Sequence, residues 1–531
     1  MKPSGDRLRA AIYQPPAGLY TAPGDDFVLA QVIVVHRHGD RAPISRSAGS
    51  KLRCDASTWA ARLLPPADLA ALNASFPVQS LPAVQSLPAS TKPASRAVDE
   101  NGDPPFGQLT KVGGAQCVAL GTAVRESLEA HAPHLLQGDG LRGRVLVHAT
   151  AIQRTQAHPL AQHIRWARLW PGFRASVRVL PTYLLPLLPL PIYLLTYLPT
   201  CLPACLSVCL HTYLYSSQLS VQHVLRGLLG PELEPELVTE LGTEPQREAR
   251  PRVRVPVLVR PIADEPLLPC PQHCGLLKHR MRQVSTAAKR AAAIEPEAQA
   301  LMQRVSEALG YDESNASVAL SRLEAAREVA TCYVAHGDPL PAALSEEDVL
   351  GMLELNARLL AQTHADPQVG RLGMGRLLAE IDSWLAAAAR REPEAPRLVL
   401  LSGHDSTLVP LLASLHLFDA AWSWPPYVAH VRIELAHVRH GGAPAARLLY
   451  QGLPLTATAS HGQGHGEQED PGAGWIGLEA FRELLRPVRL TEEQYAEECV
   501  RKADVEPEAA DAKKADAALQ HTLIAPSHSR M

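Results

Sequence analysis

The stretch VIVVHRHGDRAP, at residues 32–43, runs an apolar strand directly into two histidines and two arginines. A buried strand normally ends in turn residues, and a run of cationic residues normally lies on an open surface. Residues 28–36 have the apolar, β-branched composition of a strand that is buried on both faces. We therefore expect a central strand that delivers a polar cluster to one rim of a sheet.

The rest of the chain alternates strand-like and helix-like segments. Strands are expected at 143–150, 253–261 and 396–401, and the pair 428–438 and 446–455 alternates as a hairpin. Pro256 places the strand at 253–261 on an edge or at a bulge. Helical spacing covers 108–131 and much of 285–390, and the block at 285–365 is expected to form a helical cap. The alternation predicts an α/β fold with a mostly parallel central sheet flanked by helices.

Two further polar signals follow strands of this predicted sheet. SGHDST (402–407) comes after the strand at 396–401, with a turn at Ser402–Gly403, and opens a helix from about 406; Arg154 comes shortly after the strand at 143–150. The carboxyl ends of parallel strands meet at one rim, where open α/β sheets bind ligands. Arginine forks and helix N-termini bind phosphate oxygens, a histidine nitrogen can attack phosphorus, and an aspartate can protonate the departing oxygen. The signals together predict a phosphate site.

RHGDRAP (37–43) and HD (404–405), with an arginine between them in sequence, resemble the histidine phosphatase superfamily in its acid phosphatase branch. Gly403 stands where that family more usually has alanine. Stretches at 107–121, 263–274, 418–435 and 490–500 are similar to the lysophosphatidic acid phosphatase group within the branch, whereas 174–250 is not covered. The resemblance implies a phosphoglycerate mutase-like sheet with a helical cap, and an enzyme that hydrolyses phosphate monoesters.

The same resemblance implies a role for each residue of the clusters. His38 would attack phosphorus and carry a phosphohistidine. Asp405 would protonate the leaving group and then assist a water molecule, and repulsion by the phosphate would favour its acid form. The phosphoryl oxygens would be held by Arg37, Arg41, Arg154 and His404. No metal or cofactor is implied, because the arginines supply the charge that a cation would otherwise bring.

Alternative functions stay open at this point. A non-catalytic protein that binds phosphorylated ligands would need the arginines but not Asp405. A phosphotransferase of mutase type would use the same histidine. The resemblance suggests lysophosphatidic acid or another lipid phosphate as the small-molecule substrate, and inositol phosphates and phosphorylated sugars are the alternatives.

Several residues near the motifs have two possible roles. His36 is expected to be packed or on the surface, and Asp40 to be a turn residue or the partner of a nearby arginine. Trp422, Trp424 and Tyr427 would either line a substrate mouth or pack in the core.

Composition limits the class of protein. The 531 residues carry a formal net charge of −3, so no broad basic field is available for a nucleic acid. Nine irregularly spaced cysteines do not form the framework of a small secreted protein. Cys270 and Cys274 with His273 and His279 resemble a zinc cluster only weakly. The N-terminus lacks the apolar core of a signal peptide, which predicts a cytoplasmic or organellar protein.

Residues 179–210 carry no charge and are long enough to cross a bilayer, but six prolines argue against a membrane span. Tetrads that end in leucine, such as PTCL and PACL, favour a translated DNA repeat. We therefore expect 174–250 to be a low-complexity insertion, either disordered or left by an unspliced intron. It would divide a core of 26–173 and 251–500, flanked by an N-terminal extension (1–25) and a disordered tail (501–531).

Overall fold

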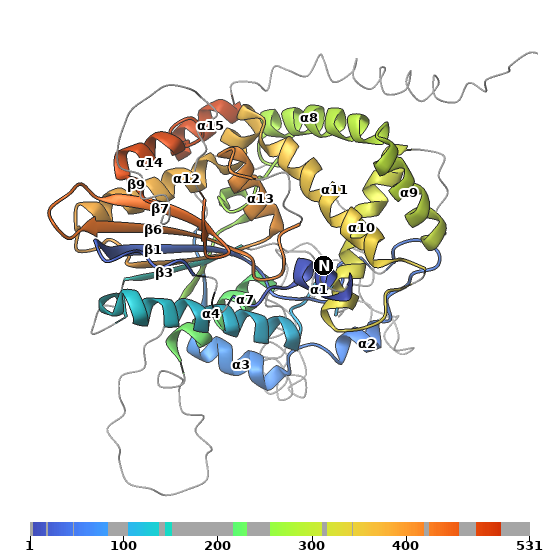
Figure 1. Cartoon of the computed structure of the whole chain (residues 1–531), viewed down its shortest axis with the longest axis horizontal. Coiled ribbons are helices and arrows are strands. Elements are labelled where there is room, and N and C mark those ends of the chain that lie inside the picture. Colours follow the sequence, from blue (N-terminus) through green and yellow to red (C-terminus); the bar gives the residue numbers. More distant parts are fainter. Residues whose placement is uncertain are drawn as a thin grey trace, which may run out of the picture.

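The computed structural model describes residues 4–82 apart from 17, 19 and 46, then 105–136, 144–150, 216–230, 255–310, 316–418 apart from 342, 424–455 and 474–500. Within these residues, nine strands form one sheet of order β2-β4-β3-β5-β1-β6-β7-β8, with β9 paired to β7 (Figure 1). The strands are β1 (Phe27–Arg37), β2 (Val78–Ser80), β3 (Val145–Ala149), β4 (Val257–Val259), β5 (Leu398–Gly403), β6 (His430–Val438), β7 (Ala445–Tyr450), β8 (Leu453–Pro454) and β9 (Ile476–Gly477).

The five strands from β2 to β1 run parallel, and β6 to β9 add an antiparallel half. The expected α/β class with a central, mostly parallel sheet is confirmed. The strand at 253–261 differs from its prediction, because β4 lies between β2 and β3 and not on an edge. Pro256 precedes the paired residues and therefore removes no hydrogen bond from the sheet.

Strand β1 is buried on both faces, which accounts for its continuous apolar sequence. Val32 and Val34 belong to the hydrophobic core on one side, and Ile33 and Val35 to the core on the other side. The first core contains α3 (Pro66–Ser75), α4 (Lys111–His131) and α7 (Ser216–Leu229). The second contains α12 (Pro367–Ala389), α13 (Asp405–Ser414) and α14 (Leu478–Leu485). Figure 1 shows these helices below and above the sheet.

A helical cap stands beside the sheet. It contains α8 (Gly275–Ala293), α9 (Pro296–Leu309), α10 (Ala316–Ala335) and α11 (Glu346–His364), so it begins about three α-helical turns before the expected residue 285. Helix α1 (Ser4–Ile12) packs Leu8 and Ile12 into the core of this cap. Residues 4–12 of the expected N-terminal extension (1–25) therefore pack against the cap.

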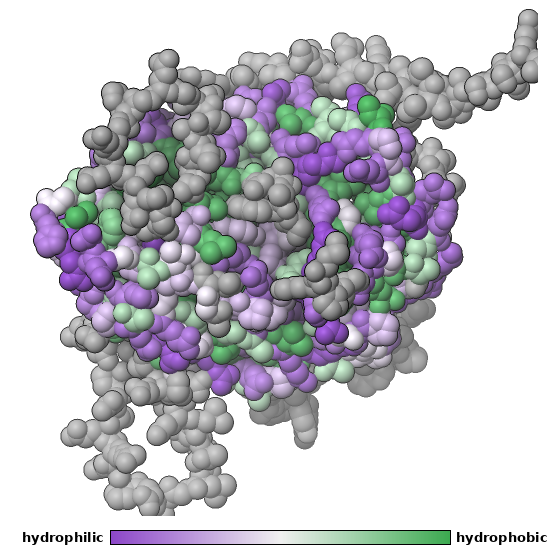
Figure 2. Space-filling model, in the orientation of Figure 1, coloured by the Kyte–Doolittle hydropathy of each residue, from purple (hydrophilic) through white to green (hydrophobic). Residues whose placement is uncertain are grey.

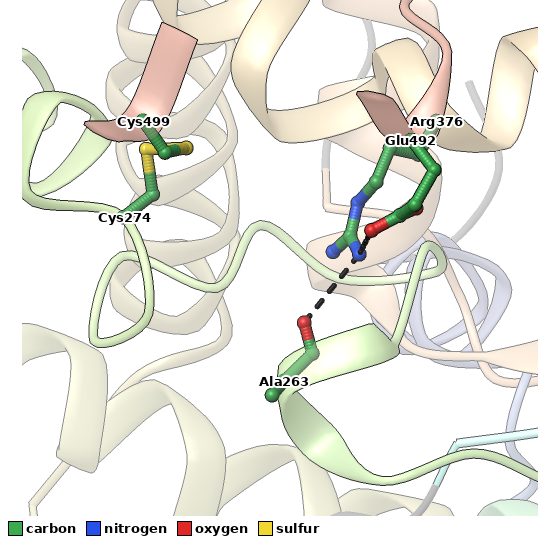
Figure 3. Close-up of a disulfide and its surroundings, with 5 residues drawn as sticks. All are labelled: Ala263, Cys274, Arg376, Glu492 and Cys499. Carbon is green, nitrogen blue, oxygen red and sulfur yellow. Dashed lines mark hydrogen bonds and ion pairs between the residues drawn. A yellow bond between two sulfur atoms is a disulfide. The ribbon is translucent and has the colours of Figure 1, made fainter. Parts of the chain in front are cut away.

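Smaller elements complete the described structure. They are α2 (Ala56–Ala60), α15 (Glu492–Val500) and two 3₁₀ turns at Pro133–Leu135 and Ile262–Asp264. A disulfide joins Cys274, the residue before α8, to Cys499 in α15 (Figure 3). Cys274 therefore cannot be a thiolate ligand of the weak zinc-like pattern at 270–279. Among the described residues, no group of three or more His, Cys, Asp or Glu side chains could hold a metal ion.

Helix α7 lies inside the segment 174–250, which we expected to be an insertion outside the fold. Most of its side chains are buried, and they pack along α4 and under the sheet. A Cβ atom on Gly227 would overlap Val118 O of α4, and one on Gly121 would overlap Val224 O of α7. The backbones of α4 and α7 are thus in direct contact at Gly121 and Gly227, so α7 belongs to the core. The remaining parts of 174–250, the repeat at 179–210 and the tail at 501–531 lie outside the described residues.

This contact predicts that Gly227→Ala destabilises the protein. Alanine favours a helix by about 1 kcal/mol over glycine, but its methyl group would enter the backbone of α4, an overpacking that costs about 1–3 kcal/mol. We expect a net loss of unfolding free energy in a thermal or urea melt. Arg226→Ala, on the exposed side of the same helix, is the matched control. A Gly227→Ala protein more stable than wild type would show that α7 does not pack on α4 in this way.

Figure 2 shows hydrophilic and hydrophobic residues interspersed over the coloured part of this face. Ile294 and Leu453 are the large hydrophobic side chains that the described residues expose, and single exposed side chains are ordinary. In the described part of the chain, no helix combines the length and apolarity that a bilayer crossing needs.

Candidate active site

Two polar loops meet at the carboxyl ends of β1 and β5, which are neighbours in the sheet. Arg37 pairs with Gly403 in the parallel register, and the backbone N–H of His38 donates to Gly403 O at 3.2 Å. The imidazole rings of His38 and His404 are 5.3 Å apart, centroid to centroid. The structure therefore brings the two sequence clusters into one site.

The protonation of His38 is fixed by its own loop. Its Nδ1 lies 2.7 Å from Gly39 O, and a carbonyl can only accept, so Nδ1 carries the hydrogen and Nε2 keeps a lone pair. The side chain is 2% exposed. Burial lowers the pKa of His38 well below its usual value, and the charges of Arg37 and Arg41 lower it further. At neutral pH the ring is uncharged, and Nε2 has the lone pair that a nucleophile needs.

Arg37 holds Asp405 across the site. Its Nη2 lies 3.0 Å from Asp405 Oδ2, its Nη1 donates to Pro425 O at 2.6 Å, and its guanidinium lies over the Tyr427 ring. Its buried Nε has no hydrogen-bond partner within the described residues. Arg37 is therefore rigidly placed and still has a donor to offer to an anion.

Asp405 is the first residue of α13 and is ionised in the free site. Its Oδ2 also accepts from Trp424 Nε1 at 3.1 Å, and its Oδ1 accepts from Ser406 N at 2.8 Å. Burial alone would raise its pKa, but Arg37 and Arg327 outweigh burial and lower the pKa far below its usual range. A role as proton donor thus requires that a bound anion first changes this balance.

Arg41 is held by the cap. Its Nη1 lies 2.6 Å from Glu328 Oε1 of α10 and 3.2 Å from Ala42 O. Burial would lower the pKa of Arg41, but the Glu328 carboxylate outweighs burial and raises it, so Arg41 keeps its charge. Glu328 also accepts from the backbone N–H groups of Ile44 and Ser45. One carboxylate of the cap therefore fixes the whole turn after His38.

His404 is oriented through a chain of hydroxyls that ends on α7. Thr150 Oγ1 donates to Ser217 Oγ at 2.9 Å and therefore accepts from His404 Nε2, which lies 2.8 Å away. Ser217 Oγ in turn donates to Thr150 O. Ser220, one turn along α7, accepts from the backbone N–H of Gly39 at 3.2 Å. The first turn of α7 thus contacts both polar loops.

The His38 loop also lies directly on α4. A Cβ atom on Gly39 would overlap Gly113 O, and one on Gly113 would overlap Asp40 O, so both positions require glycine. Asp40 was expected to be a turn residue or an arginine partner, but its Oδ2 instead accepts from Thr110 Oγ1 at 2.6 Å and from His336 Nε2 at 2.7 Å. It connects the loop to α4 and to the cap.

Other candidate residues fall outside the site or outside the described chain. Arg154 and Trp422 are not among the described residues, so nothing here places them. His36 is buried, with Nδ1 2.9 Å from Arg37 O. Trp424 and Tyr427 lie in the site, against Asp405 and Arg37. No sequence motif pointed to four further residues of the site, because their contacts are with elements far away in sequence. They are Thr150, Ser217, Arg327 and Glu328.

Parts of the chain are similar in sequence to known proteins. Residues 28–157 match the family model described as histidine phosphatase superfamily (branch 2). Human testicular acid phosphatase is 31% identical over 206 residues, which are 38% of this chain and 46% of that protein. A probable acid phosphatase of Dictyostelium discoideum is 30% identical over 90 residues, 17% of this chain and 19% of that protein. The chain thus matches less than half the length of either relative.

Solved structures of similar shape were also found. A phytase from Citrobacter braakii is 16% identical, with a TM-score of 0.48, and the match covers 89% of this chain and 99% of that one. The multiple inositol polyphosphate phosphatase of Bifidobacterium longum is 10% identical, with a TM-score of 0.47, over 91% of this chain and 97% of that one. The match to the family model of the histidine phosphatase superfamily (branch 2) at 28–157 includes the entire His38 loop of this chain.

Proposed function

We propose that the protein is a metal-independent acid phosphatase that hydrolyses phosphate monoesters through a phosphohistidine on His38. The fixed tautomer carries this proposal: because Nδ1 donates to Gly39 O, the lone pair of Nε2 is available beside His404 and Arg37. In the first step Nε2 attacks phosphorus, the ester P–O bond breaks, and the leaving oxygen takes a proton from Asp405. In the second, water gives a proton to Asp405 and attacks phosphorus, and the P–N bond breaks.

The proton of Asp405 has to arrive with the substrate. In the free site Arg37 and Arg327 keep the pKa of Asp405 low. A bound phosphate competes for Arg37 and adds a like charge beside the carboxylate, and both changes raise the pKa of Asp405. Phosphate monoesters lose their second proton near about pH 6, so on the acid side the substrate itself carries the proton. This supports activity below neutral pH.

Lysophosphatidic acid is the proposed substrate, on the likeness of residues 107–121, 263–274, 418–435 and 490–500 to that group of phosphatases. Initial rates with lysophosphatidic acid, inositol hexakisphosphate and glucose 6-phosphate would rank the three classes. If kcat/KM for lysophosphatidic acid is below the values for the other two, lysophosphatidic acid is not the preferred substrate. The proposed phosphohistidine chemistry would be unaffected.

A rapid-quench experiment with p-nitrophenyl phosphate tests the catalytic proposal. We expect a burst of nitrophenol in proportion to enzyme and a phosphoryl group on His38 by mass spectrometry, because a covalent intermediate forms before water attacks. A non-catalytic phosphate-binding protein would give neither the burst nor the modified peptide. A mutase-type transferase would pass the phosphoryl group to a sugar phosphate in preference to water.

Asp405→Asn tests the proton donor. General acid catalysis contributes roughly 10²–10⁴-fold when the leaving group is a poor one. We therefore expect kcat/KM for glycerol phosphate to fall by about that factor and that for p-nitrophenyl phosphate to fall much less, because nitrophenolate leaves without a proton. Equal slowing of both esters would remove Asp405 from the role of acid.

A further inference from the structure

Arg327 of the cap is a buried cation whose placement the phosphoryl-transfer chemistry leaves unexplained. The residue is 5% exposed, and its Cζ lies 3.7 Å from the centroid of the Trp424 indole. Its Nε has no hydrogen-bond partner, and it forms no ion pair with a carboxylate, among the residues that the structure describes. A buried guanidinium of this kind is costly, so its contact with the indole requires an explanation.

Trp424 connects Arg327 to the catalytic carboxylate. The indole Nε1–H donates to Asp405 Oδ2 at 3.1 Å, and the same oxygen lies 3.0 Å from Arg37 Nη2. When a phosphate draws Arg37 toward its own oxygens, the indole N–H is the donor that stays on Oδ2. With the backbone N–H of Ser406 on Oδ1, the indole N–H on Oδ2 fixes the plane of the carboxyl group. The orientation of the acid thus depends on the indole.

Helix α10 cannot easily shift away from this position. The residue after Arg327, Glu328, holds Arg41 and the backbone N–H groups of Ile44 and Ser45. His336, just beyond the end of the helix, donates to Asp40 Oδ2. Two contacts with the His38 loop therefore fix α10, and they fix Arg327 over the indole. A cation over an indole face is attracted by the ring quadrupole, most strongly when both groups are desolvated.

We propose that Arg327 is a positioning residue for proton transfer, which clamps the Trp424 indole so that its N–H holds Oδ2 of Asp405 and fixes the carboxyl group in the orientation from which it protonates the leaving oxygen. The inference rests on the proposed function, because it presupposes that Asp405 acts as an acid. The electrostatics agree with it: Arg327 lowers the pKa of Asp405, and Asp405 partly restores the pKa of Arg327 that burial lowers.

Paired substrates separate this role from a structural one. With Arg327→Met we expect kcat/KM for glycerol phosphate to fall about tenfold, the scale of a desolvated cation–π contact, and that for p-nitrophenyl phosphate to fall by less than about threefold. Arg327→Lys, which keeps a cation over the ring, should recover most of the loss. Arg358→Met, which removes a cap arginine paired with Glu295, should change neither value.

The double variant decides whether Arg327 acts through the indole. Trp424→Phe keeps the ring and removes the N–H, and we expect Arg327→Met to add almost nothing to it. Additive losses in the double variant, or equal losses on both esters, would overturn the inference, while turnover of p-nitrophenyl phosphate by wild type would keep the proposed function standing. If wild type forms no phosphoenzyme at all, the proposed function fails and the inference fails with it.

Discussion

Replacing His38 with alanine is expected to abolish turnover of phosphate esters. The lone pair of Nε2 is the group in position to attack phosphorus, and Nδ1 is already occupied by Gly39 O. Removal of an essential nucleophile lowers kcat by roughly 10⁴–10⁶-fold in enzymes where this has been measured. The loss should be as large for p-nitrophenyl phosphate as for an alkyl ester, because both need the same attack, and the phosphoryl label should disappear from the peptide that contains residue 38.

The fold must survive for this result to have meaning. His38 is buried, so the alanine variant should be compared with wild type in a thermal melt. It should still bind inorganic phosphate, because Arg37 and His404 remain in place. His364→Leu, a change of a buried histidine on α11, should retain turnover and serves as the matched control. A folded His38→Ala protein with more than about a tenth of wild-type kcat would assign the nucleophile elsewhere.

The polar loops could be predicted because their signals are local. The apolar run of β1 ends at Arg37, and the strand of β5 passes directly into His404 and Asp405. Parallel neighbours bring such ends together, so two short motifs were enough to place both clusters on one rim. The cap was also visible, because several amphipathic helices follow one another without strands between them.

Contacts between elements that are distant in sequence leave no local sequence pattern, so they could not be predicted. Arg327 and Glu328 reach the site from a cap helix almost 300 residues after His38, and α7 reaches it from within a segment whose repeats indicated an insertion. The need for glycine where α4 meets α7 can be recognised only when the positions of both helix backbones are known. Likewise, the partners of Asp40 are Thr110 and His336, and neither hydrogen bond could be predicted from the sequence around Asp40.

Acid should destabilise the protein steeply, because three buried histidines resist protonation. Burial lowers the pKa of His36, His364 and His430 to about 4 from a usual value of 6.5, and Arg432 adds to the effect on His430. The unfolded chain therefore binds more protons than the native protein between pH 6.5 and 4. Each histidine contributes stability that is complete above pH 6.5 and is lost as the pH falls toward 4, about 3 kcal/mol apiece.

Three such losses sum to about 9 kcal/mol, which is comparable with the whole unfolding free energy of a typical domain. Urea melts at pH 7, 6, 5 and 4 should show this decline. In His364→Leu the unfolding free energy should fall less steeply with pH, by the contribution of one proton, and turnover should not change. Saturating phosphate should offset part of the loss, about 3 kcal/mol at 100 times its dissociation constant, because it binds the native state alone. An enzyme working on the acid side would then be protected chiefly by its own ligand; a flat stability profile between pH 7 and 4 would show that these histidines are protonated in the native protein.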